Sequence, residues 1–295
     1  MLRVTPLESF VPIRVQGADA RAFMQGQLSY DVRKLTSERA VWGGHCTGQG
    51  RVQLVMTLLE REEGLVALCD SSSANDLLAS LRARIFSSKV SFEPLPLAIA
   101  AVSAGDMLGL LNRLPQARGE CAGAGQVTVL RWWGAAQRFL LITPHAQTQA
   151  LPDEGGRQAL AWRESDVMDG LPRIFPETER AFVPQMLNLD LLEGISYDKG
   201  CYTGQEVVAR ARRGGVPRRM FRFSAGCVAP RPGTVVGHKE AEVGLVVDAV
   251  ASPTGCELLA VVDLATLSAE LSLRGIESSD LALTTLPYDV PRERR

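Results

Sequence analysis

The sequence predicts an α+β fold: two related units of antiparallel sheet and helix, followed by a small C-terminal β-barrel. Two observations carry this prediction. A strand hairpin followed by a helix pattern occurs twice, within residues 51–84 and again from residue 126. Beyond residue 216, short apolar runs alternate with Gly, Pro and Asp, and there is little helix pattern. We therefore expect domains at 1–90, 91–215 and 216–295, with the first two interleaved.

The elements of the first unit follow from hydrophobic periodicity. Residues 51–60 and 64–69 are apolar runs of strand length, joined by the polar turn 61–63. A helical pattern follows over 75–84, and a shorter helix is expected earlier, over 18–26. Together these segments form the first hairpin and its helices.

The second unit repeats that order. Residues 126–133 and 138–143 are strand-like and flank a turn, and a helix is expected to start after Pro144. A further short helix is expected over 105–114. The Arg-rich stretch that follows ends near Gly214-Gly215-Val216-Pro217, where Gly-Gly and Pro stop a helix. The strands expected in the C-terminal domain are 220–225, 242–249, 256–263 and 268–274.

Bulk composition excludes several classes of protein. A net charge of −1 with 46% hydrophobic residues is unlike a disordered tail or a globally basic nucleic-acid binder. No apolar run approaches the roughly 20 residues that span a bilayer, and the first residues do not resemble a secretion signal. None of the six cysteines forms a Cys-x-x-Cys pair, which argues against structural zinc and against a self-contained iron–sulfur site. We expect a reducing, cytoplasmic location and no resident metal.

The octapeptide Lys-Gly-Cys-Tyr-Thr-Gly-Gln-Glu at residues 199–206 is the most specific chemical feature. It places the thiol of Cys201 close to Lys199 and just before an expected helix, whose start is marked by a capping-box pattern, Thr203-x-x-Glu206. A thiol in such a position loses its proton more readily than a free cysteine, and the thiolate is the reactive form. From spacing alone, a buried structural cysteine in a glycine-rich turn is an equal alternative.

The octapeptide resembles the signature of the YgfZ family, folate-binding proteins linked to iron–sulfur enzymes and tRNA modification. The resemblance spans residues 10–225 closely and the remainder more loosely. Further matching segments occur in the same order, at 24–28, 31–32, 45–46, 50–51, 85–87, 138–143, 184–189 and 194–197. An ordered series of matches is far more specific than one Gly-rich or Cys motif.

The resemblance implies a ring of three domains, related to the aminomethyltransferase of glycine cleavage, with tetrahydrofolate or a derivative at its centre. It implies a cytoplasmic factor that supports assembly or repair of iron–sulfur clusters, with iron–sulfur enzymes or assembly factors as partners and an indirect role in tRNA modification. Membrane and DNA are not expected partners. The active groups would be Cys201 and Lys199, the latter holding the thiolate. The rest of the motif would shape the turn and fix its geometry: Gly200, Tyr202, Thr203, Gly204, Gln205 and Glu206.

Three residues are candidates for folate contact. Trp162, eight residues before Gly170, corresponds to a folate-contacting tryptophan of the family, and an indole face suits a flat pterin ring. Phe10 stands where the family has tryptophan; it keeps a stacking face but lacks the indole N–H. Arg210 is our choice for a ligand contact within the arginine run 210–222. The alternatives are that both rings belong only to the core, and that the arginines form a solvated face.

One absence bears on mechanism. The aminomethyltransferase relatives carry adjacent aspartates where this chain has Gln53 and Leu54, and neither side chain can hold a negative charge. This favours a folate-binding accessory protein without transferase activity. Two alternatives stay open: a tetrahydrofolate-dependent aminomethyltransferase, and an RNA- or protein-binding module that uses the arginine run. His45-Cys46 is expected to be a buried cysteine beside a loop histidine.

Overall fold

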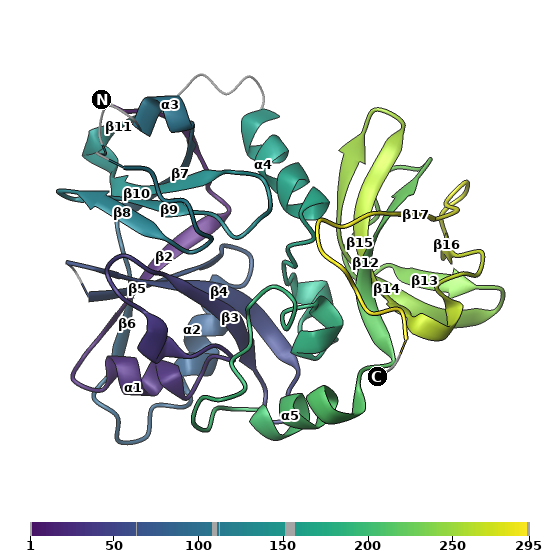
Figure 1. Cartoon of the computed structure of the whole chain (residues 1–295), viewed down its shortest axis with the longest axis horizontal. Helices are drawn as coiled ribbons and strands as arrows, with labels where there is room; N and C mark the ends of the chain where they lie inside the picture. The colour runs from purple at the N-terminus through teal and green to yellow at the C-terminus, as the bar shows by residue number, and fades with distance from the viewer. Residues whose placement is uncertain (1, 63, 108–110, 112, 151–156, 294–295) are drawn as a thin grey trace.

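A computed structural model describes residues 2–62, 64–107, 111, 113–150 and 157–293 of the chain, and it shows a mixed α+β architecture with three largely antiparallel sheets (Figure 1). Two sheets lie in the N-terminal half, and the third is built from the last part of the chain. The α+β class predicted from the sequence is confirmed. Within the described residues, no helix is both long enough and apolar enough to cross a membrane.

The first sheet has five strands in the order β3-β4-β5-β2-β6. One face of the sheet packs on two helices, and Leu77 and Leu81 of the second helix, four residues apart, are both 1% exposed. The predicted hairpin 51–60/64–69 and the helices 18–26 and 75–84 are confirmed. The elements are β2 (Phe10–Gln16), α1 (Ala20–Gln25), η1 (Val32–Lys34), β3 (Val41–Cys46), β4 (Val52–Arg61), β5 (Gly64–Asp70), α2 (Ala74–Arg82) and β6 (Ser91–Pro94).

The second sheet has six strands in the order β11-β1-β7-β10-β9-β8. All neighbours are antiparallel except β1 and β11, which are parallel. The predicted strand pair 126–133/138–143 corresponds to its central hairpin. The elements are β1 (Leu2–Pro6), β7 (Leu97–Val102), α3 (Ala104–Met107), β8 (Cys121–Ala124), β9 (Val127–Arg131), β10 (Phe139–Pro144), η2 (His145–Gln147) and β11 (Thr148–Ala150).

The two sheets share one topology. In each, a strand is followed by a helix and then by three consecutive antiparallel strands, the last of which pairs with the first: β2 with β5, and β7 with β10. The sequence repeat therefore corresponds to a repeat of strand order. The outer neighbour of that first strand differs in origin, because β6 follows its own unit whereas β1 comes from the start of the chain. The two units are thus joined by an exchanged strand.

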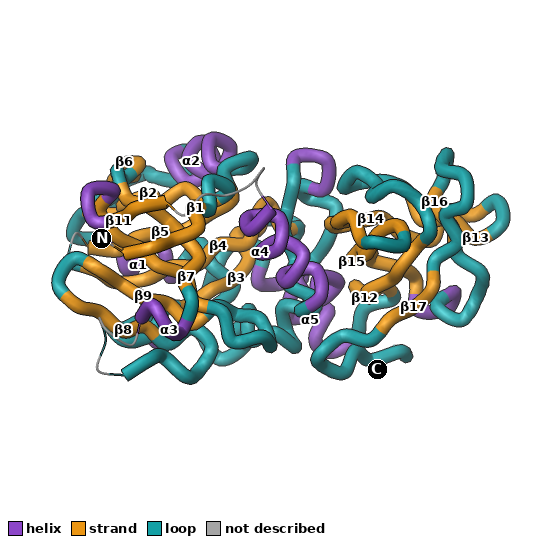
Figure 2. Tube along the Cα trace, turned by 90° about the horizontal axis from the view of Figure 1, so that it is seen from above, coloured by secondary structure: helices purple, strands orange, loops and turns teal. Residues whose placement is uncertain are grey.

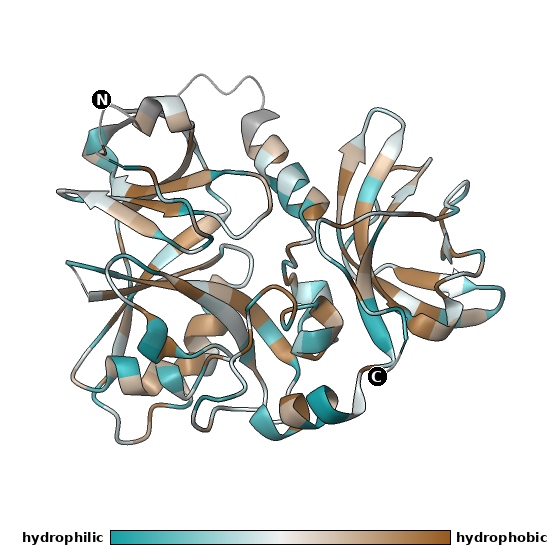
Figure 3. Ribbon diagram, in the orientation of Figure 1, coloured by the Kyte–Doolittle hydropathy of each residue, from teal (hydrophilic) through white to brown (hydrophobic). Residues whose placement is uncertain are grey.

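The third sheet has six strands in the order β16-β13-β14-β15-β12-β17 around its own apolar core. Figure 2 shows α4 and α5 lying between this sheet and the N-terminal pair. Figure 3 shows hydrophobic residues along the strands and strongly hydrophilic ones on α5. The elements are α4 (Arg157–Met168), η4 (Pro176–Thr178), η5 (Pro184–Leu187), α5 (Gln205–Gly214), β12 (Arg218–Ala225), β13 (Val235–His238), β14 (Ala241–Ser252), β15 (Gly255–Asp263), η6 (Leu264–Thr266), β16 (Ser272–Leu273) and β17 (Ala282–Thr284).

Some expected elements differ from the structure. After Pro144 the chain forms only the short turn η2 and then β11, and the helix begins at Arg157, because β11 finds a partner in β1 at the sheet edge. The helix expected over 105–114 is α3 at Ala104–Met107, and residues 108–110 and 112 lie outside the described residues. The strand expected over 268–274 contains only Ser272 and Leu273. Closure of the third sheet into a barrel, the ring and the domain boundaries stay predictions.

Candidate functional site

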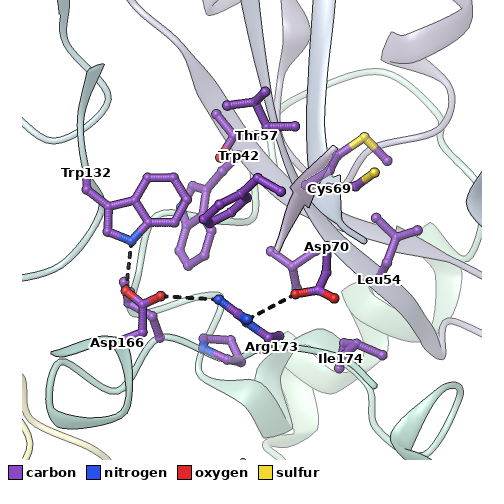
Figure 4. A pocket seen from close by; sticks show the side chains of 15 residues that line it. Trp42, Leu54, Thr57, Cys69, Asp70, Trp132, Asp166, Arg173 and Ile174 are labelled. Atoms are coloured by element: carbon purple, nitrogen blue, oxygen red, sulfur yellow. Dashed lines mark hydrogen bonds and ion pairs between the residues drawn. The ribbon is translucent and has the colours of Figure 1, made fainter. Parts of the chain in front are cut away.

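A cavity of about 60 Å³ lies where the two related sheets and the segment after α4 meet (Figure 4). Strands β2 to β5 form one wall, Trp132 after β9 forms another, and Asp166 of α4 with residues 171–174 closes the third side. Ligand sites commonly combine such apolar walls with a few polar groups. The lining residues are Phe10, Trp42, Leu54, Val55, Met56, Thr57, Leu68, Cys69, Asp70, Trp132, Asp166, Leu171, Pro172, Arg173 and Ile174.

Aromatic rings fix the shape of the cavity. Phe10 meets Trp132 edge to face, with ring centroids 5.3 Å apart at 76°. Trp42 stacks on Trp133 at 5.4 Å and 12°, and the indole N–H of Trp133 donates to Thr57 Oγ1 at 2.9 Å. Because these rings come from both sheets and hold one another, they give the cavity rigid, flat walls.

Charged groups line the opposite side. Arg173 lies between two carboxylates, with Nη1 3.1 Å from Asp70 Oδ2 and Nη2 3.7 Å from Asp166 Oδ2. The Trp132 indole donates to Asp166 Oδ1 at 2.9 Å, and Arg138 donates to the same oxygen at 2.7 Å. Burial raises the pKa of Asp166, and the two arginines oppose that rise. Asp166 is therefore a hub that ties Trp132 to both guanidinium groups.

Three buried polar atoms near the cavity lack a hydrogen-bond partner: Asp70 Oδ2, the indole nitrogen of Trp162 and Arg138 Nε. Asp70 Oδ2 is close to Arg173, but the pair is not aligned as a hydrogen bond, so this oxygen can still accept one. The indole N–H of Trp162 likewise has no acceptor. A pterin offers ring N–H donors and carbonyl or ring-nitrogen acceptors, and among the lining residues Asp70 is an acceptor for the former and Arg173 a donor for the latter. The volume fits only part of it, because ligand pockets usually measure about 300–1,000 Å³.

The structure separates the two aromatic candidates from the sequence. Phe10 lines the cavity directly. Trp162 is 6% exposed and does not line it; its ring packs against Trp132 at 5.7 Å, and the guanidinium of Arg138 lies over it at 4.6 Å. Trp162 thus supports Trp132 from behind, and its contact with folate stays a prediction.

The positions of the missing acids lie at the edge of this cavity. Leu54 is one of its lining residues, whereas Gln53 points into a hydrogen-bond network. The amide of Gln53 donates to Glu179 Oε1 at 3.2 Å and accepts from Ser80 Oγ at 3.2 Å. Gln53, Ser80, Glu179 and Asp76 line a second, smaller cavity of about 10 Å³. A carboxylate is therefore present beside Gln53, although it comes from another segment.

His45 belongs to the same network. The sequence predicted a loop at this position, but His45 lies in β3 and is 0% exposed. Its Nδ1 faces the carbonyl of Gln27 at 3.2 Å, and Nε2 lies 3.2 Å from Ser80 Oγ and 3.3 Å from Arg84 Nη1. Burial, with the nearby Arg84, lowers the pKa of His45 to about 4. The imidazole is therefore neutral, donates from Nδ1 and accepts at Nε2.

Lys199 anchors the motif by binding backbone. The residue is 5% exposed, and its ammonium group donates to the carbonyls of Gln25, Leu28 and Tyr30 at 2.6, 2.6 and 3.0 Å. Burial lowers its pKa to about 8. Because an ammonium has three protons and three carbonyls take them, none is left to hold the thiolate of Cys201. Two segments that carry the family resemblance, 24–28 and 199–206, are therefore tied together in space.

Cys201 lies in the loop between this anchor and α5. All six cysteines are in the described part of the chain, and Cys201 is the one that is exposed. The next turn of the loop is tight: Gly204 has φ +83°, and a Cβ added there would lie 2.5 Å from Thr47 O. Gly200, in contrast, has no atom within 4 Å of an added Cβ, so the loop does not require glycine there.

The capping box expected at the start of α5 is not formed. The helix begins at Gln205 with Gly204 as its N-cap, and no side chain caps it, because the left-handed Gly204 occupies the position expected for Thr203. Thr203 instead donates its backbone N–H to Gly26 O at 3.1 Å. Glu206 pairs along the helix with Arg210 at 2.9 Å, and both side chains are largely exposed. Neither Arg210 nor Cys201 lines the cavity; the motif packs on the 47–50 turn of the β3–β4 hairpin.

Several cavity residues escaped prediction from sequence. Trp132 carried a signal, since a Trp-Trp pair at the end of a strand suits a site wall. Asp70, Asp166 and Arg173 carried none, because single charged residues at the ends of elements are common and their pairing joins distant segments. Among the described residues, no group of three or more His, Cys, Asp or Glu side chains could hold a metal ion.

Comparisons with known proteins agree with this architecture. No family model matches the chain. It is 31% identical over 311 aligned residues to the "tRNA-modifying protein YgfZ" of Serratia proteamaculans, covering 99% of this chain and 94% of that protein. The protein of the same name from Yersinia pestis is 30% identical with the same coverage.

A solved structure supports the fold. The glycine cleavage system aminomethyltransferase T from Bartonella henselae aligns with a TM-score of 0.73 and 16% identity, covering 97% of this chain and 85% of that one. With near-complete coverage at about 30% identity to relatives that share one name, the chain belongs to the YgfZ family.

Proposed function

We propose that the protein binds tetrahydrofolate or a derivative at the cavity of Figure 4 and supports tRNA modification in the cytoplasm. The observation that carries the proposal is the cavity itself, at the junction of two sheets, with rigid aromatic walls and a carboxylate oxygen, Asp70 Oδ2, that has no hydrogen-bond partner. Membership of a family whose relatives are named tRNA-modifying proteins, and a fold like that of an aminomethyltransferase, support it.

The residues of the cavity have distinct roles in this proposal. Trp132 and Phe10 would provide apolar faces for a flat ring, and Asp70 Oδ2 would accept a hydrogen bond from its N–H edge. Arg173 would donate hydrogen bonds to acceptor atoms of the ligand. Since the cavity measures about 60 Å³, lining side chains must move to admit a whole pterin. When bound, a reduced folate would supply a carrier for a one-carbon unit.

Titration calorimetry with tetrahydrofolate tests this site. Trp132→Ala should weaken binding by about 1–3 kcal/mol, the range for a lost aromatic stack. Trp162→Ala should also weaken it, through loss of support for Trp132. Leu160→Ala, on the exposed side of α4, is the matched control and should bind normally. Absence of binding by the unmodified protein, or unchanged affinity in a folded Trp132→Ala variant, would contradict the proposal.

We further propose that Cys201 supports assembly or repair of iron–sulfur clusters in enzymes that modify tRNA. Its exposure in an anchored loop supports a role for its thiol, whereas the other five cysteines are buried. One thiol cannot hold a cluster alone, so a partner protein or small thiol must share the ligation. Cys201→Ser should fold normally yet fail to restore iron–sulfur enzyme activity in cells lacking the native protein. Full restoration by a stably expressed variant would remove Cys201 from this role.

Aminomethyl transfer is a second candidate with one observation in its favour. Glu179 is hydrogen-bonded to Gln53, and Asp76 lines the same small cavity, so carboxylates lie near the position of the missing acids. We nevertheless propose that transfer does not occur, because Glu179 is already paired with Arg180 at 3.0 Å. Purified protein, aminomethyl-lipoyl carrier and tetrahydrofolate should yield no methylene-tetrahydrofolate above the uncatalysed rate. Clear turnover would make the transferase the better description.

A further inference from the structure

Two cysteines, Cys227 and Cys256, belong to the apolar core of the third sheet, and neither is part of the Cys201 motif. Cys256 is the second residue of β15 and pairs across the antiparallel ladder with Ala225, the last residue of β12. Cys227 follows two residues later. Cys227 lies in the bend just beyond β12, so the pairing of Ala225 with Cys256 brings this bend close to the start of β15.

The backbones at this point approach closely. A Cβ added to Gly255 would lie 2.1 Å from the carbonyl oxygen of Ala225 and 2.8 Å from Gly226 Cα. The chain bends at Gly226 and Cys227, directly after this close approach. Both cysteines belong to the same apolar cluster, at 9% and 0% exposed for Cys227 and Cys256.

The electrostatics of Cys256 agree with this closeness: burial first, and then the neighbouring Cys227, raises the pKa of Cys256 to about 12. Cys227 is the more exposed of the two, at 9% against 0%, and the next residue, Val228, is 86% exposed. Two free cysteines on adjoining backbone segments, one of them nearer the surface, are candidates for a disulfide, which spans Cα atoms about 4.4–6.8 Å apart.

We propose that Cys227 and Cys256 form a reversible intramolecular disulfide when the protein meets a peroxide. The sulfur of Cys227, nearer the surface, attacks one peroxide oxygen, breaking the O–O bond and giving a sulfenic acid and water. The sulfur of Cys256 then attacks the Cys227 sulfur, the S–O bond breaks, and the oxygen leaves as a second water molecule. Two thiol protons and two electrons thus pass to the peroxide. Thiol reductants reverse the bond by exchange.

The bond would fasten the end of β12 to the β14–β15 hairpin. The start of β12 contacts the centre of the molecule, where Asn188 Nδ2 donates to Met220 O at 2.7 Å. Oxidation would therefore stiffen a strand that links the third sheet to the rest of the chain. The inference is independent of the folate proposal, since it uses none of the cavity residues.

Peptide mapping of the oxidised protein is the test. The reduced full-length protein is treated with hydrogen peroxide, alkylated with iodoacetamide and digested without reductant for mass spectrometry. We expect a peptide pair joined through Cys227 and Cys256 that dithiothreitol separates. Recovery of both residues as alkylated thiols, while Cys201 is oxidised, would overturn the proposal.

Two variants and one condition separate this reaction from others. Cys201→Ser should still form the bond, whereas Cys256→Ala should leave Cys227 as a sulfenic or sulfinic acid. If Cys256→Ala does not fold, the peptide map of the unmodified protein decides.

Because the attacking form of Cys256 is the thiolate, the rate of bond formation should rise about tenfold from about pH 7 to about pH 8. The oxidised protein should also melt at a higher temperature than the reduced one, and equal melting temperatures would count against an intramolecular bond.

Discussion

Replacing Gly204 by alanine tests whether the Cys201 loop depends on a close backbone contact. Gly204 has φ +83°, a region that costs a residue with a Cβ about 1–2 kcal/mol. The new methyl carbon would also lie 2.5 Å from Thr47 O and 2.8 Å from Gly50 Cα, both of which are backbone atoms that cannot rotate away. Overpacking of this kind costs about 1–3 kcal/mol. We expect a total loss of about 2–5 kcal/mol.

The same motif supplies a matched control. Gly200 has no atom within 4 Å of an added Cβ, and its φ is not positive. Gly200→Ala should change the free energy of unfolding by less than about 0.5 kcal/mol, as expected for an unobstructed exposed site. Both substitutions add one methyl group and lower the entropy of the unfolded chain alike. Their difference therefore isolates the contact between the motif and the 47–50 turn.

Urea unfolding followed by tryptophan fluorescence measures this difference. With a slope of about 3 kcal/mol/M, a loss of about 3 kcal/mol lowers the midpoint by about 1 M. Gly204→Ala should show that shift, and Gly200→Ala should match the unmodified protein. Equal midpoints for the two variants would refute the reasoning, because they would show that the loop moves aside without cost.

Two further predictions concern buried ionisable groups. The pKa of His45 is about 4 in the folded protein, below its ordinary value of 6.5. Between these two pH values the unfolded state therefore binds more protons than the folded state. The free energy of unfolding should fall by up to about 1.4 kcal/mol per pH unit as the pH drops from 6.5 to 4. Urea midpoints of His45→Gln over that range should lack this component, and parallel curves would contradict it. Lys199→Met leaves three buried carbonyls without their donor and should cost about 2–4 kcal/mol. It should also speed hydrogen exchange at residues 196–204, and unchanged exchange would show that the loop is held by other contacts.

Much of the fold follows from local pattern. The hairpin within β4 and β5 was predictable because a run such as GLVALC is strongly apolar and rich in strand formers. Strands β3 and β8, in contrast, contain Gly43, Gly44 and Gly123 and have little strand propensity of their own. They form because each extends a sheet beside a strong neighbour, β4 or β9. The strand propensity of a segment does not reveal which strand it will lie beside in the fold.

The candidate site was also predictable from sequence only in part. The octapeptide was recognisable from sequence, because its spacing is specific, and the structure anchors it beside residues 24–28. The role expected for Lys199 could not be judged from spacing, since three carbonyls from a distant segment claim its protons. The expected cap at Thr203 failed for a related reason: a left-handed Gly204 fits the contact with Thr47, and that contact is tertiary.

The strand exchanged at the start of the chain has a consequence for how the protein is made. β1 is synthesised before the other described strands, yet Thr5 pairs with Ala101 and Leu2 with Thr148. The first sheet can assemble as soon as β6 is available, whereas β1 must wait until most of the second unit has been synthesised. Pairing over such long sequence separations slows folding and leaves an unpaired strand edge exposed in the meantime. The edge that waits for β1 is thus a place where the nascent chain would benefit from a chaperone.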